Sequence, residues 1–277
     1  MKSMGMGHHP APTAGDVAFL SHLTRHGNHE PGEIRQALLE DDTYLDRLVE
    51  DPEVRDFLRD TDPKPESDLL LQVSAWLLFA LYLRLARREL DTGTAVPEWT
   101  GAQEVVPVFD ADLIRDALSS PEILSQLERL LNRYTRVRAG WYTAWERGHL
   151  SRRRWNDLDP ASLLNLLPYA EGEVAADLLR RAGDAHLFLA GMFPEHVLGH
   201  LSRDLDAWER RGQGFYRAAA AKYEDGMPDW SGDLERLGGQ FHGARRSLNY
   251  VMQRFWSRSR TSWFRPTSRN TGRKGVA

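Results

Sequence analysis

The sequence of 277 residues contains no cysteine, which excludes disulfides, thiol nucleophiles and thiolate-bound metals. It also lacks the run of about 20 apolar residues that a membrane-spanning helix needs. The most apolar stretch, 73–83, is about half that length and contains one polar residue, Ser74. No apolar core of signal-peptide length is visible in the first 15 residues. We therefore expect a cytoplasmic protein that is not transmembrane.

The sequence also lacks the short motifs that mark common enzyme classes. It has no glycine-rich phosphate loop, no G-x-S-x-G and no dinucleotide-binding fingerprint. It has neither H-E-x-x-H nor the pair of E-x-x-H motifs found in helical di-iron proteins. We therefore predict no cofactor and assign no catalytic residue.

Acidic residues are absent from the C-terminal part of the chain. After Glu235 there is no Asp or Glu, and residues 236–277 carry nine Arg and one Lys. The rest then holds 26 basic and 40 acidic residues, a net charge of −14. An acidic body with a basic tail indicates something about partners rather than about the fold.

The composition and the spacing of apolar residues predict an all-α protein. Hydrophobic residues make up 41% and charged residues 27% of the chain, as in globular proteins. We predict a flexible leader at 1–15, a single domain of about ten helices over 16–256, and a disordered basic tail at 257–277. A short extended segment is expected near 105–109, where Pro107 would limit it to the edge of a sheet.

Helix boundaries follow from caps, prolines and apolar periodicity. The predicted helices cover 16–25, 31–50 and 52–60 (two or three short helices in all), 68–90, 113–118, 121–137, 160–168, 171–192, 203–222 and 233–256. The segment 68–90 is expected to be a central buried helix. A break is expected at Pro194, and Asp110 is expected to cap the helix that follows it.

The segment 140–157 is both aromatic and basic. Its notable residues are Trp141, Tyr142, Trp145, Arg147, Arg152, Arg153, Arg154 and Trp155. We expect a helix here, on which Trp141 and Trp145 lie one turn apart and share a face. We expect this face to be buried beside solvated arginines. The alternative is a site for base stacking or for phosphate.

Residues 182–200, AGDAHLFLAGMFPEHVLGH, mix apolar and reactive side chains most densely. The candidates are Asp184, His186, Glu195, His196 and His200. Carboxylate and imidazole ligands suit Zn, Fe or Mn, and His196 and His200 have the i, i+4 spacing of two helical ligands. The favoured interpretation is structural, because buried polar groups need hydrogen-bond partners. Glu195 would then favour the start of the helix after Pro194, and His196 and His200 would lie at the surface.

Asp184 carries the sharpest prediction within this cluster. A carboxylate inside an apolar helix is costly unless it is paired. We predict that Asp184 is buried and bound either to an arginine or to the start of a helix. The candidate arginines are Arg180, Arg181 and those of the segment 140–157.

The C-terminal tail interleaves arginines with aromatic residues. The candidate contacts to an anionic partner are Arg254, Trp256, Arg258, Arg260, Trp263 and Arg265. Arginines can neutralise phosphates while rings stack on bases, as in proteins that grip single strands. The same composition suits an anionic membrane surface, contact with the acidic body of the chain itself, or a merely solubilising end.

Four segments resemble landmarks of a family of helical bacterial and archaeal proteins with no established activity. They are VSAWLLFALYLRLARREL at 73–90, VPVFDADLI at 106–114, GDAHLFLAGMFPEH at 183–196 and FHGARRSLNYVMQRFW at 241–256. The resemblance implies that 70–256 is one folded unit, and it supplies no catalytic residue.

The leading prediction is a non-enzymatic interaction or regulatory protein. Its basic aromatic tail would engage an acidic partner, which is a nucleic acid, a protein or an anionic surface. The alternative is a helical enzyme that depends on a metal or a small molecule and uses the cluster between Asp184 and His200.

Overall fold

In the computed structural model, the chain forms one mostly helical domain, whose described residues contain thirteen α-helices and two antiparallel hairpins. The described residues are 10–24, 30–41, 43–59, 72–91, 96–101, 104–108, 110–146, 148–224 and 226–256. The all-α prediction is confirmed, and ten of these helices are longer than five residues. The predicted leader is described only from Pro10, and the predicted tail at 257–277 lies outside the described residues.

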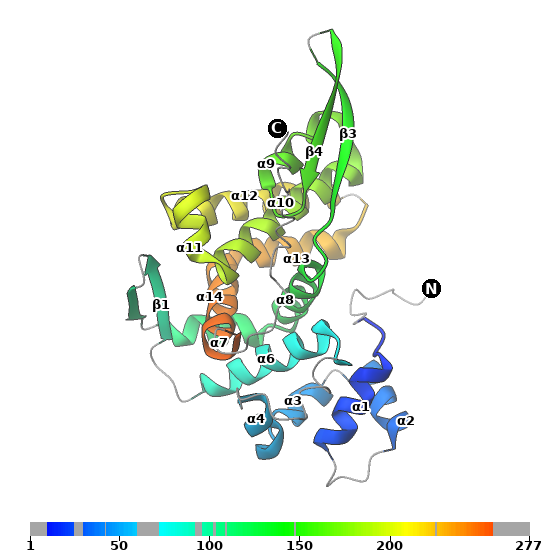
Figure 1. Ribbon diagram of the computed structural model, residues 1–277, viewed down its shortest axis with the longest axis vertical. Helices are drawn as coiled ribbons and strands as arrows, with labels where there is room; N and C mark the ends of the chain where they lie inside the picture. The colour runs from blue at the N-terminus through cyan, green and yellow to red at the C-terminus, as the bar shows by residue number, and fades with distance from the viewer. Residues whose placement is uncertain are drawn as a thin grey trace, which may run out of the picture.

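Four short helices form the N-terminal end of the domain, opposite the long hairpin in Figure 1. They are α1 (Ala14–Leu23), α2 (Pro31–Glu40), α3 (Tyr44–Leu48) and α4 (Pro52–Arg59). Thr13 and Asp16 form a capping box at the start of α1. The buried Asp16 carboxylate also accepts a 2.7 Å hydrogen bond from the backbone N–H of Ser74. One side chain therefore joins the starts of two helices.

The most apolar segment forms α6 (Ala75–Glu89), which lies between the N-terminal helices and the rest of the domain (Figure 1). The hydroxyl of Ser74 caps it by accepting a hydrogen bond from the backbone N–H of Leu77. Ten of its fifteen residues are buried, including Trp76 and Phe79. The prediction of a central buried helix is confirmed. No helix in the described ranges is long and apolar enough to cross a bilayer.

The predicted extended segment is strand β2 (Glu104–Val108), which pairs with β1 (Val96–Gly101). The sequence indicated no partner strand, because 91–103 has the composition of a polar loop. The chain continues with α7 (Ala111–Ser119) and α8 (Pro121–Tyr134). Asp110 stands at the N-cap position of α7 but makes no side-chain capping bond. Its carboxylate binds Arg246 instead, so the predicted capping role is wrong.

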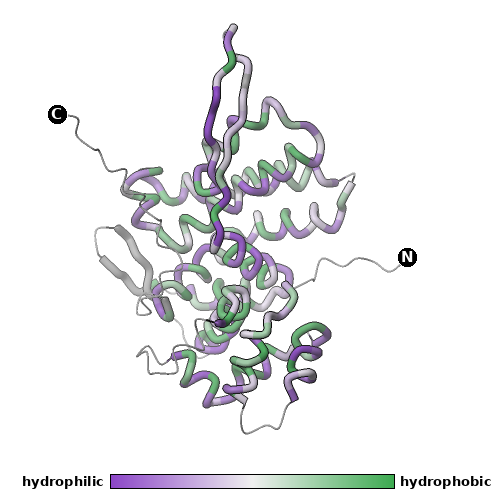
Figure 2. The backbone as a smooth tube through the Cα atoms, turned by 45° about the vertical axis from the view of Figure 1, so that its right-hand side comes forward, coloured by the Kyte–Doolittle hydropathy of each residue, from purple (hydrophilic) through white to green (hydrophobic). Residues whose placement is uncertain are grey.

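The segment predicted to be an aromatic helix is an antiparallel hairpin, β3 (Ala139–Glu146) and β4 (His149–Asn156). Glu146 pairs with His149, so the turn contains two residues, and Gly148 has the positive φ of 84° that such turns need. The helical prediction is wrong because aromatic and Thr residues in β3 favour a strand. Figures 1 and 2 show this hairpin, hereafter the arm, projecting beyond the helices.

The C-terminal half contains the two longest helices, α10 (Gly172–Met192) and α12 (Leu205–Tyr223). Its other helices are α9 (Pro160–Leu164), α11 (Pro194–His196), α13 (Pro228–Gly239) and α14 (Phe241–Val251). The break at Pro194 is confirmed. The predicted helix at 233–256 is wrong, since the chain turns at Gln240, after two glycines. A π-helical turn, Met252–Trp256, ends the described chain.

One hydrophobic core joins the two ends of the domain. Buried apolar residues form a single cluster that runs from Val17 in α1 to Phe255 after α14. Glycines allow the closest helix contacts. At Gly212 in α12, a Cβ atom would lie 2.5 Å from the Phe241 ring and 2.9 Å from the Cβ of His186. The contact among α10, α12 and α14 therefore requires glycine at this position.

Two glycines in α12 provide a matched test of this packing. We expect Gly212→Ala to lower the free energy of unfolding by about 1–3 kcal/mol, because the added methyl overpacks the core. Gly214→Ala, whose Cβ would meet no atom within 4 Å, should raise it by up to about 1 kcal/mol through helix propensity. Urea denaturation measures both values, and equal effects of the two variants would contradict the packing.

Candidate functional site

The predicted polar cluster divides into two parts in the structure. Asp184 and His186 lie in the interior on α10, with 7% and 3% of their surface exposed. Glu195, His196 and His200 are exposed beyond the break at Phe193 and Pro194. The break turns the chain, so the five residues do not form a common site.

Asp184 is buried and bound to arginines, as predicted. Its Oδ2 accepts hydrogen bonds of 2.8 Å from Arg180 and 2.7 Å from Arg133, which lies on α8. The Tyr216 hydroxyl of α12 donates to Oδ1 at 2.9 Å. Arg180 was a predicted partner and Arg133 was not, whereas Arg181 binds Asp157. Both carboxylate oxygens therefore serve contacts among α8, α10 and α12.

The charges around Asp184 keep its partners protonated. Burial alone would lower the pKa of Arg180, but the charges of Asp184 and Asp177 outweigh it and raise that pKa. Burial raises the pKa of the Tyr216 hydroxyl well above 10, and Asp184 raises it further. The two groups therefore stay hydrogen-bond donors to the carboxylate over the physiological pH range.

His186 is a core residue whose ring is hydrogen-bonded through Nδ1. Its Nδ1 lies 2.8 Å from the carbonyl oxygen of Ala182, and the ring stacks on Trp208 with centroids 4.1 Å apart. Burial lowers the pKa of His186 to about 4, so the ring is neutral at pH 7. A neutral Nδ1–H donates to that carbonyl, which fixes the tautomer.

The exposed residues of the cluster form a pair of histidines. The ring centroids of His196, at the end of α11, and His200, in the following π-helical turn Val197–Leu201, lie 5.0 Å apart. Glu195 occupies the first turn of α11. Within the described part of the chain, no group of three or more His, Asp or Glu residues could hold a metal ion.

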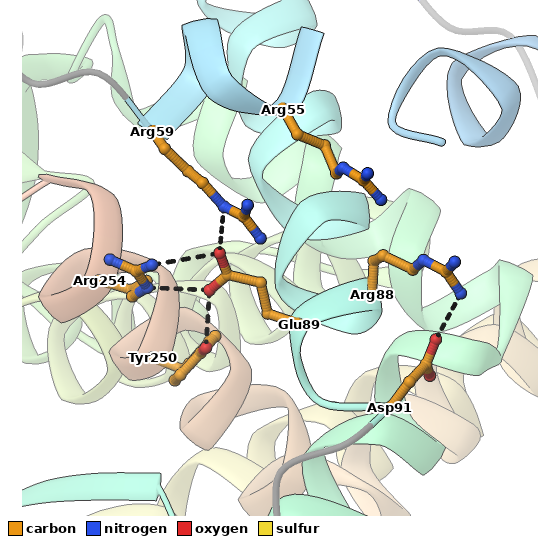
Figure 3. Close-up of a pocket in the computed structure, with 7 residues that line it drawn as sticks. All are labelled: Arg55, Arg59, Arg88, Glu89, Asp91, Tyr250 and Arg254. Atoms are coloured by element: carbon orange, nitrogen blue, oxygen red, sulfur yellow. Dashed lines mark hydrogen bonds and ion pairs between the residues drawn. The ribbon is translucent and has the colours of Figure 1, made fainter. Parts of the chain in front are cut away.

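Of the tail candidates, Arg254 is the one whose side chain the structure describes. It donates to Glu89 at the end of α6, at 2.8 and 3.2 Å, and Arg59 and Tyr250 converge on the same carboxylate (Figure 3). Trp256 ends the π-helical turn. Arg258, Arg260, Trp263 and Arg265 lie outside the described residues. Arg254 is therefore part of an internal ion-pair cluster.

A cavity of about 480 Å³ surrounds this cluster. Its lining residues are Arg55, Arg59, Arg88, Glu89, Asp91, Tyr250 and Arg254 (Figure 3). Arg88 is paired with Asp91 and with Glu50, at 3.2 and 3.0 Å. Most of the cations that line the cavity are thus bound to carboxylates of the chain itself, and the cavity joins α4, α6 and the C-terminal segment.

The arm presents two large aromatic side chains at the surface. Beyond the first pair at its base, cross-strand pairing places six exposed residues on one face of the arm: Trp141, Thr143, Trp145, Leu150, Arg152 and Arg154. The two indoles are 58% and 67% exposed. The Arg152 guanidinium lies 4.7 Å from the centroid of the Trp141 ring. The predicted burial of this aromatic face is therefore wrong.

The other face of the arm is anchored to the body. Trp155 stacks with Arg181 of α10 at 4.8 Å, and Gly140 across from it leaves room for the indole. Tyr142 lies with its ring centroid 6.2 Å from that of Tyr169. One face therefore fixes the arm, while the face with Trp141 and Trp145 remains exposed.

The arm is basic, whereas the chain as a whole is acidic. Residues 136–156 hold six arginines and one glutamate, a formal charge of +5 in a chain of net charge −4. None of the six residues on the exposed face is acidic. The sequence shows that the segment is aromatic and basic, but its exposed face exists because the segment forms strands rather than a helix. The signal for that strand was the run of aromatic and Thr residues before Arg147-Gly148.

Comparison of the chain with protein-family models, curated proteins and solved structures gave no match. The resemblance to a helical bacterial and archaeal family therefore stays a prediction. Any function has to be argued from the geometry of this chain.

Removal of the Asp184 carboxylate tests the buried network. We expect Asp184→Ala to lower the free energy of unfolding by about 3–5 kcal/mol, because two arginines lose their buried counter-charge. Asp177→Ala is the matched control on the same helix, since Asp177 also binds Arg180 but is 43% exposed. Its loss should cost about 1 kcal/mol or less. Equal losses in urea denaturation would contradict the network.

Acidification tests the burial of His186. Its pKa is about 4 in the fold against 6.5 for a free imidazole, so the unfolded chain binds more protons between these values. Stability therefore falls as the pH drops from 6.5 towards 4. Between pH 7 and 5 we expect His186→Gln to lose about 2 kcal/mol less stability than the wild type. His196→Gln controls for loss of an exposed ring, and an unchanged pH dependence in His186→Gln would contradict the assignment.

Proposed function

We propose that this chain is a non-enzymatic binding protein and that the exposed face of its arm engages an acidic partner. The observation that carries the proposal is the set of six exposed side chains, with two indoles and two guanidinium groups and no carboxylate. Large exposed apolar groups gathered in one place mark interaction sites. The adjacent cations favour a partner of negative charge.

Several contacts support the arm rather than the polar cluster as the functional surface. Asp184 and His186 are buried, and both carboxylate oxygens of Asp184 and the Nδ1 of His186 are hydrogen-bonded to groups of the same chain. Glu195, His196 and His200 are not joined to them. The five residues of the polar cluster therefore form no common site that would support the enzymatic alternative. The six side chains of the arm, in contrast, lie together at the surface.

The basic tail stays in the proposal as a second contact. Residues 257–277 carry arginines and aromatic residues but no acid, as the exposed face of the arm does. Arg254 is held by Glu89, so a tail contact would draw on the residues after Trp256. Two separate basic surfaces would let one partner molecule bind at two sites at once, and this avidity raises the overall affinity.

Inorganic polyphosphate is the probe for this proposal, because it carries phosphates without bases. We expect binding to weaken with salt and Arg152→Gln/Arg154→Gln to reduce the slope of log K against log[salt] by about two, one for each lost phosphate contact. Arg210→Gln/Arg217→Gln removes equal charge from exposed positions on α12 and should change the slope little.

A chain ending at Trp256 separates the arm from the tail in the same assay. If the proposal holds, this shortened chain retains salt-dependent binding that the arm substitutions weaken further. Binding that disappears with residues 257–277 and ignores the arm substitutions would overturn the role of the arm. No salt-dependent binding by any form would overturn the proposed function as a whole.

A further inference from the structure

We infer that the acidic partner is a single-stranded nucleic acid, with Trp141 and Trp145 stacking on bases while Arg152 and Arg154 contact phosphates. This inference rests on the proposed function and names its partner. Every base has a flat π face, so exposed aromatic rings combined with cations suit a strand of any sequence.

The spacing along the arm fits this partner. Trp141 and Trp145 are four residues apart on one face, which corresponds to about 13 Å along a strand. Arg152 pairs across from Thr143 and so stands between the two indoles along the arm. The face therefore offers two rings for bases and, between them, a cation for the phosphate backbone that carries those bases.

The contact between Arg152 and Trp141 brings the group that would bind a phosphate next to the ring that would stack on a base. The guanidinium lies 4.7 Å from the ring centroid, in cation–π distance. A base that stacked on Trp141 would bring its own phosphate close to this guanidinium. Arg154 lies directly across from Trp141 and supplies a second cation at the same level of the arm.

The side chains on this face favour an unpaired strand over a duplex. In a duplex the faces of the bases are stacked on one another, and a protein meets only their edges and the phosphates. Reading of base edges relies on groups such as Asn, Gln, Asp and Glu as well as Arg. None of the six exposed side chains is of these four types, and Asn156 at the base of this face accepts a hydrogen bond from the backbone N–H of Leu158, so we expect little sequence preference.

A membrane surface would use this face differently. Trp145 and Leu150 pair near the turn, so a bilayer would receive the tip of the arm. Trp141 lies about 13 Å behind Trp145 and would remain outside the apolar layer. The single-strand interpretation uses the whole face, including Trp141 with its cation, and is the one that the arrangement favours.

The test measures binding of the full-length chain by fluorescence anisotropy. The probes are oligothymidylate and oligouridylate of 20 nucleotides, which distinguish DNA from RNA, an abasic strand of the same length and a 20-base-pair duplex. We expect both base-containing strands to bind more tightly than the abasic strand and the duplex. Trp141→Ala and Trp145→Ala should each weaken binding to them by about 5- to 150-fold and leave abasic binding unchanged.

Leu150→Ala is the matched control, because Leu150 pairs directly with Trp145 and is equally exposed, at 66%, but has no aromatic face. It should change binding less than about twofold if stacking drives the interaction. Trp145→Phe retains a ring and should restore much of the affinity that Trp145→Ala loses. This rescue separates stacking from any effect of the alanine variant on the hairpin.

Three results would overturn the inference. They are equal affinity for the abasic strand, tighter binding to the duplex, and binding to phosphatidylserine vesicles that Leu150→Ala weakens as much as Trp145→Ala does. If abasic strand and polyphosphate still bind through Arg152 and Arg154, the proposed function survives while the single-strand inference fails. If neither binds, the proposed function fails as well.

Discussion

The pairing of buried arginines with carboxylates is the interaction on which this fold depends. Asp184 receives Arg180 from its own helix, Arg133 from α8 and a tyrosine hydroxyl from α12. A buried charge that loses its partner costs several kcal/mol, so these helices pack stably only where the partners meet. Apolar burial supplies the main driving force for folding, and the charges select which helix faces come together.

The same pairing recurs at other contacts between distant segments. The pairs are Arg84 of α6 with Glu128 of α8, Arg246 of α14 with Asp110 before α7, and Arg245 of α14 with Glu209 of α12. The planar guanidinium with five donors suits this use better than lysine, because it can bind a carboxylate through two bonds. Much of the arginine content of the body therefore serves internal contacts.

The arm departs from this arrangement. Arg152 lies on an aromatic ring, and the face that it shares with Trp141 and Trp145 has no carboxylate. The opposite face is fixed to the body by Trp155 and Arg181. The helical part thus pairs its buried arginines with carboxylates while the arm exposes cations and rings, and this division is why we place the binding function on the arm.

The sequence by itself determined the features that depend on local physics. Apolar periodicity predicted the buried helix α6, and the cost of desolvation predicted a paired Asp184 with Arg180 one turn away. Only the tertiary structure decided that Arg133, 51 residues before Asp184, completes the pairing, and that Asp110 binds Arg246 rather than capping its helix. The tertiary structure also decided that the arm is a hairpin rather than a helix. Residues at i and i+4, such as Trp141 and Trp145, share a face in a helix and in a strand alike. Cross-strand pairing and packing against the body choose between the two, and neither can be read from spacing along the chain.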